Sequence, residues 1–308
     1  MGSASRAQLT GCHSRSVGIR KSDRNRNRRD PGMSTAKIAL LPDRGVVAVT
    51  GEDARKFLDN IITNDMDLLE KQDAIFAGLL SPQGKILFDF FVVPKGSGYL
   101  LDIAKERAGD FVKRLAMYRL RAKVSIAERP EVHVIARWPK EDGFADPRLA
   151  VLGGREISEA AASTESGAFN AYHAHRIALG VPEGGKDYGF GEAFPHEALF
   201  DQLNGVSFTK GCYVGQEIVA RMEHRGTARK RIVRVSGESA LPVAGTAVLA
   251  GEVAIGEMGS NSGLQGLALL RLDRVAEFAG KGIGLTAGGI RIHADAGDVA
   301  RLSPKDAG

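Results

Sequence analysis

The sequence of 308 residues is short of cysteine and tryptophan and has no long apolar run. Its two cysteines, Cys12 and Cys212, are too few for a disulfide framework, and no CxxC pair with the spacing of a zinc site occurs. No apolar stretch approaches the roughly 20 residues that cross a bilayer, so no membrane is expected as a partner. The Walker A and dinucleotide signatures and the G-x-S-x-G motif of hydrolases are also missing. Disulfide-stapled, zinc-finger, membrane-spanning and P-loop classes are therefore excluded.

The charge of the chain is unevenly distributed. Of 42 basic and 37 acidic residues, eight basic and two acidic ones lie in residues 1–32, which leaves 34 and 35 in the rest. The rest is therefore nearly neutral, and the net charge of +5 is no evidence for direct nucleic-acid binding. A content of 43% hydrophobic and 26% charged residues is ordinary for a soluble protein of about two domains.

Residues 1–32 form a basic leader with too few aliphatic residues for a secretory signal. We expect a disordered extension, with Met33 as the native start, and the alternative is a mitochondrial transit peptide. The expected location is accordingly the cytoplasm of a bacterium, or the mitochondrial matrix if the leader is a transit peptide.

After Met33, strands alternate with helices. The apolar pattern predicts strands over 46–49, 86–93, 99–103, 124–126 and 132–135. It also predicts helices over 54–62, 111–118 and 167–179. The residues Thr50 to Asp53 are a candidate capping box for the first helix. This order of elements predicts an α+β fold, with helices on one face of a mostly antiparallel sheet.

The pattern of apolar residues and glycines in the sequence changes after Arg229. Short strands are predicted over 231–235, 246–249, 267–270 and 290–294, with glycines every few residues, as is typical of a small β-barrel or sandwich. With a boundary near Gly226, we expect a leader over 1–32, an α+β body over 33–225 and a β-barrel over 226–308.

Cys212 is the first candidate for chemistry. If Thr209 caps the helix that follows, Cys212 lies in its first turn, where the positive end of the helix dipole and Lys210 favour the thiolate. Gly211 and Gly215 leave room for close approach of a backbone or ligand. The alternative is an inert, buried thiol. One thiolate cannot hold an iron–sulfur cluster, so a cluster or disulfide needs thiols from a partner.

Asp89 is the second candidate, because it is the one carboxylate in a strand that is apolar on both faces. It is either a hydrogen-bonded structural residue or the anchor of a ligand, such as a protonated heterocycle or amide. His173 and His175 are two residues apart on a helix and lack a third ligand, so no metal site is expected. The basic residues from Arg221 to Arg231 are either a solvated face or a site for an anionic tail.

The motif around Cys212 resembles the signature of the YgfZ family, folate-binding proteins of iron–sulfur cluster maintenance. The signature comprises Lys210, Gly211, Cys212, Tyr213, Val214, Gly215, Gln216 and Glu217. Further matches lie over 49–65, 176–183 and 194–208, so the resemblance spans about residues 38–302. The family is similar to the T-protein of glycine cleavage, a tetrahydrofolate-dependent aminomethyltransferase.

This resemblance implies a T-protein-like body of ferredoxin-like lobes, a small C-terminal β-barrel and a central folate pocket. It places Asp89, Tyr172, Arg176, Glu197 and Arg44 at the folate, with Tyr172 able to stack on the pterin. The T-protein has two adjacent aspartates where this chain has Phe88 and Asp89, and the first is the catalytic one. Aminomethyl transfer is therefore not expected.

The resemblance favours an accessory factor over an enzyme. We expect it to bind a reduced folate, tetrahydrofolate, and to support assembly or repair of iron–sulfur enzymes through Cys212, assisted by Lys210 and Arg221. The expected partners are iron–sulfur assembly proteins or client enzymes, with a transient cluster shared between them. The alternatives are a tetrahydrofolate-dependent aminomethyltransferase or other one-carbon transferase, and a thiol-exchange module without folate.

Overall fold

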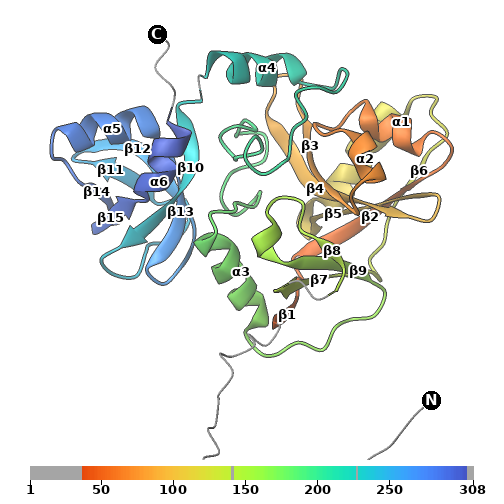
Figure 1. Cartoon of the computed structure of the whole chain (residues 1–308), viewed down its shortest axis with the longest axis horizontal. Helices are drawn as coiled ribbons and strands as arrows, with labels where there is room; N and C mark the ends of the chain where they lie inside the picture. Colours follow the sequence, from red (N-terminus) through yellow and green to blue (C-terminus); the bar gives the residue numbers. More distant parts are fainter. Residues whose placement is uncertain (1–36, 140–141, 227, 304–308) are drawn as a thin grey trace, which may run out of the picture. The chain divides into compact units, whose positions relative to one another are not determined.

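The structure is a computed structural model that describes residues 37–139, 142–226 and 228–303. Its first sheet is antiparallel and has five strands in the order β3 (Ile75–Leu80), β4 (Ile86–Lys95), β5 (Gly98–Ala104), β2 (Arg44–Thr50) and β6 (Ser125–Glu128). Two helices, α1 (Ala54–Asp59) and α2 (Ala108–Arg119), cover one face of this sheet (Figure 1). The central strands β3 and β4 are apolar and buried on both faces, as expected for a sheet that is covered on both sides.

A second antiparallel sheet has the order β1 (Lys37–Leu40), β7 (His133–Trp138), β9 (Gly154–Ser158) and β8 (Phe144–Ala145). Helix α3 (Ala168–Ala178) contacts β1 and, on its other side, β12 and β13. An apolar cluster joins this sheet to the helix-free face of the first sheet, through Val46, Leu100, Trp138 and Tyr172. The helix-free face is therefore an interior surface.

The third part of the fold is a closed barrel of six strands. It consists of β10 (Lys230–Gly237), β11 (Ala247–Ala250), β12 (Val253–Ser262), β13 (Gln265–Arg271), β14 (Leu285–Ala287) and β15 (Ile290–Ala294). Pairing of β15 with β10 closes it, and α5 (Leu272–Gly280) and α6 (Ala296–Leu302) follow β13 and β15. The predicted C-terminal barrel is confirmed, whereas the domain boundary near Gly226 stays a prediction.

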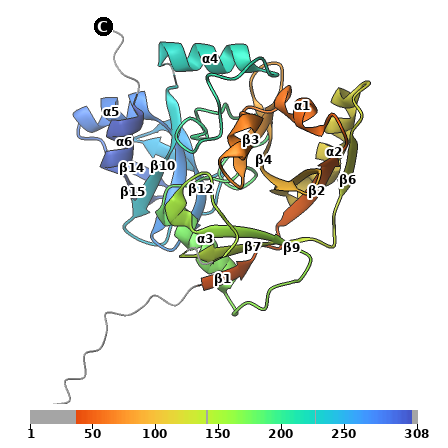
Figure 2. The same cartoon turned by 45° about the vertical axis from the view of Figure 1, so that its right-hand side comes forward.

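The remaining helix, α4 (Gln216–Arg225), lies between the body and the barrel in the chain, and Figure 2 shows it from a second side. Short 3-10 turns occupy Met66–Glu70, Lys105–Arg107 and Ala150–Leu152. No helix in the described ranges is long and apolar enough to cross a bilayer. The expectations for the leader lie outside the described residues.

The predicted capping box before α1 is wrong. Asp53 precedes the helix but makes no side-chain cap, because its carboxylate accepts the backbone N–H of Lys123 at 2.7 Å instead. The helix also ends at Asp59, before the predicted stripe ends, although Ile61 and Ile62 remain buried. A contact with a residue 70 positions away thus replaced the local one.

Candidate functional site

The helix-free face of the first sheet carries buried charge. Along β4, Phe88 and Phe90 point to the helices, where both rings pack against Phe111. Alternation therefore turns Asp89 to the opposite face, and Asp102 of β5 lies on that face too, opposite Phe91 in the ladder. Asp89 is 4% exposed and Asp102 is fully buried.

Asp102 is held between two arginines. Its carboxylate accepts Nε of Arg44 at 2.6 Å and, from Arg155, Nη2 at 2.6 Å and Nε at 3.1 Å. Burial alone would raise the pKa of Asp102, but Arg155 and Arg44 lower it. Arg155 also donates to the hydroxyl of Tyr172 at 2.8 Å. Arg44, which the sequence placed at a folate, is therefore engaged in a buried ion pair.

A third arginine completes this layer. Arg148 donates twice to Asp146, at 3.0 and 2.8 Å, and once to the Tyr172 hydroxyl at 3.2 Å. The guanidinium carbons of Arg44, Arg148 and Arg155 lie 5.8, 4.8 and 4.3 Å from the centre of the Phe91 ring. Cation–π contacts of this kind are strongest where water is excluded.

Arg176 of α3 ties the body to the barrel. Its side chain is fully buried and donates to Asp187 at 2.7 Å, to the Val181 carbonyl at 3.0 Å and to the Ser260 hydroxyl at 2.8 Å. Asp187 in turn accepts the backbone N–H groups of Glu183 and Ser260. Arg176 therefore holds a loop and strand β12 in place, and with its bond from Nε to His173 four of its five N–H donors serve contacts within the chain.

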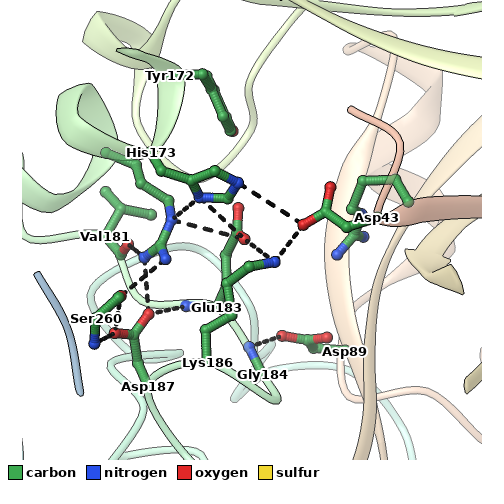
Figure 3. A network of polar contacts seen from close by, with 12 residues as sticks. Asp43, Asp89, Tyr172, His173, Val181, Glu183, Gly184, Lys186, Asp187 and Ser260 are labelled. Atoms are coloured by element: carbon green, nitrogen blue, oxygen red, sulfur yellow. Dashed lines mark hydrogen bonds and ion pairs between the residues drawn. The ribbon is translucent and has the colours of Figure 1, made fainter. Parts of the chain in front are cut away.

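Beside Arg176 lies a polar cluster of Asp43, His173, Glu183 and Lys186, which Figure 3 shows converging from α3, the loop after it and the start of β2. Nδ1 of His173 accepts Nε of Arg176 at 2.9 Å. Burial lowers the pKa of His173 to about 4, with help from Arg176 and Lys186 and against the nearby carboxylates. Burial would raise the pKa of Glu183, but its cationic neighbours, Arg176 first, hold it well below the usual value.

The ligand atoms of Asp43, His173 and Glu183 lie within 4.8 Å of one another, as a metal site requires. However, Nδ1 of His173 is an acceptor for Arg176, so the proton of the neutral ring lies on Nε2. The ammonium of Lys186 contacts Asp43 and lies 3.4 Å from Glu183. This geometry suits a charge-balanced ion-pair network rather than metal coordination.

A second group with the spacing of a metal site consists of His196, Asp201 and Glu223. Its negative charge is also balanced by a cation. Arg231 donates to Asp201 at 2.7 Å and to the His196 carbonyl at 2.8 Å. His196, which is 2% exposed, contacts Glu223 of α4 at 2.9 Å and so ties this helix to the body.

Asp89 sits behind the loop that begins at Glu183. One oxygen, Oδ2, accepts the backbone N–H of Gly184 at 3.0 Å and the hydroxyl of Tyr188 at 2.6 Å. Among the described residues, its other oxygen, Oδ1, has no hydrogen-bond partner. Burial, followed by Asp89, raises the pKa of Tyr188 well above its usual value, so the phenol stays a donor.

A hollow of about 410 Å³ adjoins this loop. Its lining mixes both signs of charge and comprises Asp43, Ala104, Lys105, Glu106, Gly184, Gly185 and Lys186. Asp89 is separated from it by Gly184, since a Cβ on Gly184 would lie 2.9 Å from the carboxylate and 2.5 Å from the Phe190 ring. The close approach of these groups requires glycine here.

The expected folate residues are not gathered around this hollow. Tyr172 is 1% exposed, its hydroxyl binds two arginines and its ring packs on Trp138 at 5.8 Å, so it offers no free face to a pterin. Glu197 accepts the backbone N–H of Phe194 at 2.8 Å and stabilises a local turn. Of the predicted residues, only Asp89 keeps an open acceptor.

Several partners in this network were not among the predicted site residues. Glu183 lies in the matched stretch 176–183 without an expected role, and Lys186 and Asp187 follow it in the same loop. The detectable signal was the presence of three charged residues within five positions after a helix end marked by Gly180 and Pro182.

Cys212 is an exposed free thiol. The predicted position in the first turn of a helix is wrong, because α4 begins at Gln216 with Gly215 as its N-cap. Cys212 therefore lies in the loop before the helix, and the helix-dipole argument does not apply to it. Its exposure also contradicts the alternative of an inert, buried thiol.

Lys210 does not serve the thiol directly. Its side chain is 2% exposed, and its ammonium donates to the carbonyls of Asp59, Ile62 and Asn64 at 2.5, 3.2 and 2.8 Å. It also pairs with the Asp59 carboxylate at 3.1 Å. Burial lowers the pKa of Lys210, against the effect of Asp59. Lys210 is therefore the anchor that fixes the Cys212 loop to the end of α1.

The other side of the loop is anchored as well. Tyr213 is buried, and Gly215 has φ +81 and packs so closely on the β3–β4 turn that a Cβ would lie 2.6 Å from the Ser81 carbonyl. Gly211, by contrast, has open space around it. Cys212 is thus held out to solvent between two fixed points, Lys210 and Tyr213.

The remaining motif residues lie on α4. Gln216 opens the helix, and Arg221 pairs with Glu217 one turn earlier at 2.8 Å on the exposed surface. Exposed pairs of this type stabilise a helix only slightly. The predicted contribution of Arg221 to an anionic partner stays a prediction.

In comparisons with protein families and with individual proteins, several similar proteins carry the same name. Residues 229–301 match the family model described as the CAF17 C-terminal beta-barrel domain. The iron-sulfur cluster assembly factor IBA57, mitochondrial, of Homo sapiens is 34% identical over 275 residues, which are 76% of this chain and 77% of that protein. The Mus musculus protein of the same name is 33% identical with the same coverage. The IBA57 homolog of Mycosarcoma maydis is 35% identical over 238 residues, and the chain spans only 59% of its length.

Comparison with solved structures gives the fold. The crystal structure of glycine cleavage system aminomethyltransferase T from Bartonella henselae superposes with a TM-score of 0.64 and 87% coverage of both chains, at 16% identity. The expected T-protein-like fold, mixed α/β with a C-terminal barrel, is confirmed. YgfZ is a related family, so the expected resemblance holds for the fold and the class of relatives, not for that family's name.

Proposed function

Because the chain belongs to the IBA57 family of iron–sulfur cluster assembly factors, we propose that it supports cluster assembly by supplying the Cys212 thiolate as one ligand of a cluster that it shares with a partner. One observation carries this proposal. Cys212 is exposed while the residues beside it, Lys210 and Tyr213, are buried and fixed. A loop built in this way presents a thiol at a defined position without enclosing it.

The ligand count requires a partner. An iron–sulfur cluster takes four protein or thiol ligands, and Cys212 is the single cysteine among the residues that the structure describes. The thiol of Cys212 loses its proton and the thiolate sulfur binds iron, while the other ligands come from an assembly or client protein or from a small thiol. The proposed partners are therefore iron–sulfur assembly proteins or iron–sulfur enzymes.

A reconstitution tests the proposal. The full chain is incubated without oxygen with ferric iron, sulfide and glutathione, which supplies the remaining thiolates. We expect sulfur-to-iron charge transfer in the circular dichroism of the protein, and its loss in Cys212→Ser. Cys12→Ser is the matched control and keeps the signal. An equal signal in the Cys212→Ser protein would contradict the proposal.

A second proposal concerns folate. We infer that a reduced folate, tetrahydrofolate, binds in the hollow next to Gly184, and that Asp89 fixes the Gly184 wall of this hollow from behind. The hydrogen bonds of Asp89 to Gly184 and Tyr188 and the cations of Lys105 and Lys186 at the hollow support this proposal. Tyr172, Arg176, Arg44 and Glu197 take no direct part, because their polar groups serve contacts within the chain.

Calorimetry on the full chain tests the folate proposal. We expect saturable binding of tetrahydrofolate, weakened in Asp89→Asn, whose amide replaces one acceptor by a donor. Asp67→Asn, at an exposed carboxylate away from the hollow, is the control for the loss of negative charge. Absence of binding to the folded protein would overturn the folate proposal and leave the cluster proposal intact.

The alternatives differ in what they demand of these residues. Aminomethyl transfer lacks its first acid, since the side chain at that position, Phe88, points into the core under α2. A thiol-exchange module would use the same exposed Cys212 but would need no iron. The reconstitution distinguishes it from the cluster proposal.

The mitochondrial names of the relatives support a mitochondrial location over the expected bacterial cytoplasm, and fractionation of cells that express the full chain tests this.

A further inference from the structure

The C-terminal end of α2 carries an apolar pair that the proposed function does not use. Met117 is 68% exposed, and Leu120, the residue after the helix, is 88% exposed. Met117 in the last turn and Leu120 directly after the helix therefore both protrude into solvent at this end of α2. Phe111 and Leu115 are fully buried on the opposite face and fix the helix on the sheet, so this patch cannot turn inward.

Leu120 is also in an unusual backbone conformation. Its φ of 45° and ψ of −108° lie where glycine or asparagine is favoured and a leucine is disfavoured. With a side chain that is 88% exposed, the leucine gains no burial that would offset this. Neither packing nor local backbone preference within the chain therefore accounts for a leucine at this position.

The charge around this pair is strongly basic. Between Arg107 and Lys123 the sequence has six basic residues and one acidic residue, although residues 33–308 as a whole are nearly neutral. Lys113 pairs with Asp110 at 3.5 Å and Lys123 with Glu52 at 2.7 Å. Arg114, Arg119 and Arg121 have no carboxylate within ion-pair distance among the described residues.

We propose that this end of α2 docks the protein on an anionic membrane surface. Exposed apolar side chains with basic residues beside them are the composition of helices that lie at lipid interfaces. Met117 and Leu120 would enter the headgroup region while Arg114, Arg119 and Arg121 meet the lipid phosphates. The expectation that no membrane is a partner rested on the lack of a spanning segment, which a docked helix does not need.

Binding of the full chain to vesicles tests this proposal. The vesicles contain phosphatidylcholine alone or with about one third phosphatidylglycerol. We expect sedimentation with the anionic vesicles only, weakened by salt. The partition coefficient should fall about fivefold for each arginine removed in Arg119→Gln and Arg121→Gln. It should fall about tenfold in the double variant Met117→Gln, Leu120→Asn.

The variants are chosen so that unfolding cannot mimic the result. Asparagine suits the backbone of Leu120, so Leu120→Asn should leave the melting temperature unchanged or raise it. Val243→Asn and Arg291→Gln change exposed barrel residues of the same kinds and should leave binding unchanged. The basic residues 1–32 are present in every variant, so any vesicle binding that they contribute is the same throughout the series.

Two results would overturn the proposal. One is that the α2 variants bind anionic vesicles as tightly as the unchanged protein, because the binding then comes from elsewhere in the chain. The other is that they lose binding to an acidic polypeptide such as polyglutamate but not to vesicles, because the patch then serves an acidic protein.

Discussion

The helix-free face of the first sheet and the Cys212 loop differ in what they expose. On the sheet face, Asp102 is fully buried and paired with Arg44 and Arg155, and Arg155 is buried as well. In the loop, the thiol of Cys212 is exposed, and only its neighbours are tied down. Charge is buried and balanced in the first region, while a nucleophile is open to solvent in the second.

This difference separates stability from function. A buried ion pair contributes little net stability, but removing one partner leaves a buried charge and is strongly destabilising. An exposed thiol contributes almost nothing to folding. Changes on the sheet face should therefore lower stability first, and changes at Cys212 should abolish function in a protein that remains folded.

The largest effect is expected for Asp102→Asn. It leaves Arg44 and Arg155 without their carboxylate in a site that is fully buried, so the free energy of unfolding should fall by about 3 to 5 kcal/mol. Asp67→Asn is the control, because its ion pair with Arg55 is exposed and its loss should cost under about 0.5 kcal/mol. Urea unfolding measures both. Equal, small losses would show that the network does not hold the fold.

The next effect is a loss of stability in acid. The pKa of His173 is about 4 in the folded protein and near 6.5 when unfolded, so the unfolded state takes up the proton first. Stability from this group is present above pH 6.5 and is lost as the pH falls toward 4, by roughly 3 kcal/mol. Glu183, whose pKa is lowered, adds a further loss below pH 4.5.

The variant His173→Asn tests this assignment. Asparagine keeps an acceptor for Arg176 but does not titrate, so the melting temperature should vary less between pH 6.5 and 5. His293→Asn, at an exposed position, should keep the original pH dependence. The assignment fails if the two variants show the same slope of melting temperature against pH.

A smaller effect is expected for Lys210→Met, which joins the two regions of the comparison. It removes the donor of three carbonyls and should lower the free energy of unfolding by about 1 to 2 kcal/mol. Because the Cys212 loop loses its anchor, hydrogen exchange of its amides should become faster and the reconstituted cluster signal weaker. Lys281→Met, at an exposed pair, should change neither. An unchanged exchange rate would contradict the anchoring role.

The sequence predicted the secondary-structure elements better than it predicted which side chains contact one another. The apolar run over 86–93 located β4, and the single carboxylate within it marked Asp89 as buried. Regular short strands with glycines predicted the barrel. The buried network was not predictable, because Arg155 and Asp102 are 53 residues apart and Arg176 and Ser260 are 84 apart. No local pattern carries such pairings.

The start of α4 shows a different kind of error. Thr209 was interpreted as the helix cap, although glycine at positions 211 and 215 disfavours a helix there. The helix instead begins after Gly215, whose φ of +81 suits glycine. The motif was identified correctly while its conformation was not, because the Cys212 loop is held by Lys210 and Tyr213 through tertiary contacts.

The central claim is that Cys212 acts and does not stabilise, and one paired measurement tests it most directly. Cells that lack this protein are supplied with the full chain or its Cys212→Ser variant. An iron–sulfur reporter enzyme is assayed in them, and the free energy of unfolding of each purified protein is measured in urea. We predict that cells with the Cys212→Ser variant have no more reporter activity than cells without the protein. The free energy of unfolding of this variant should lie within about 0.5 kcal/mol of that of the unchanged protein. Full reporter activity with Cys212→Ser, or a loss of activity explained by a matching loss of stability, would contradict the account.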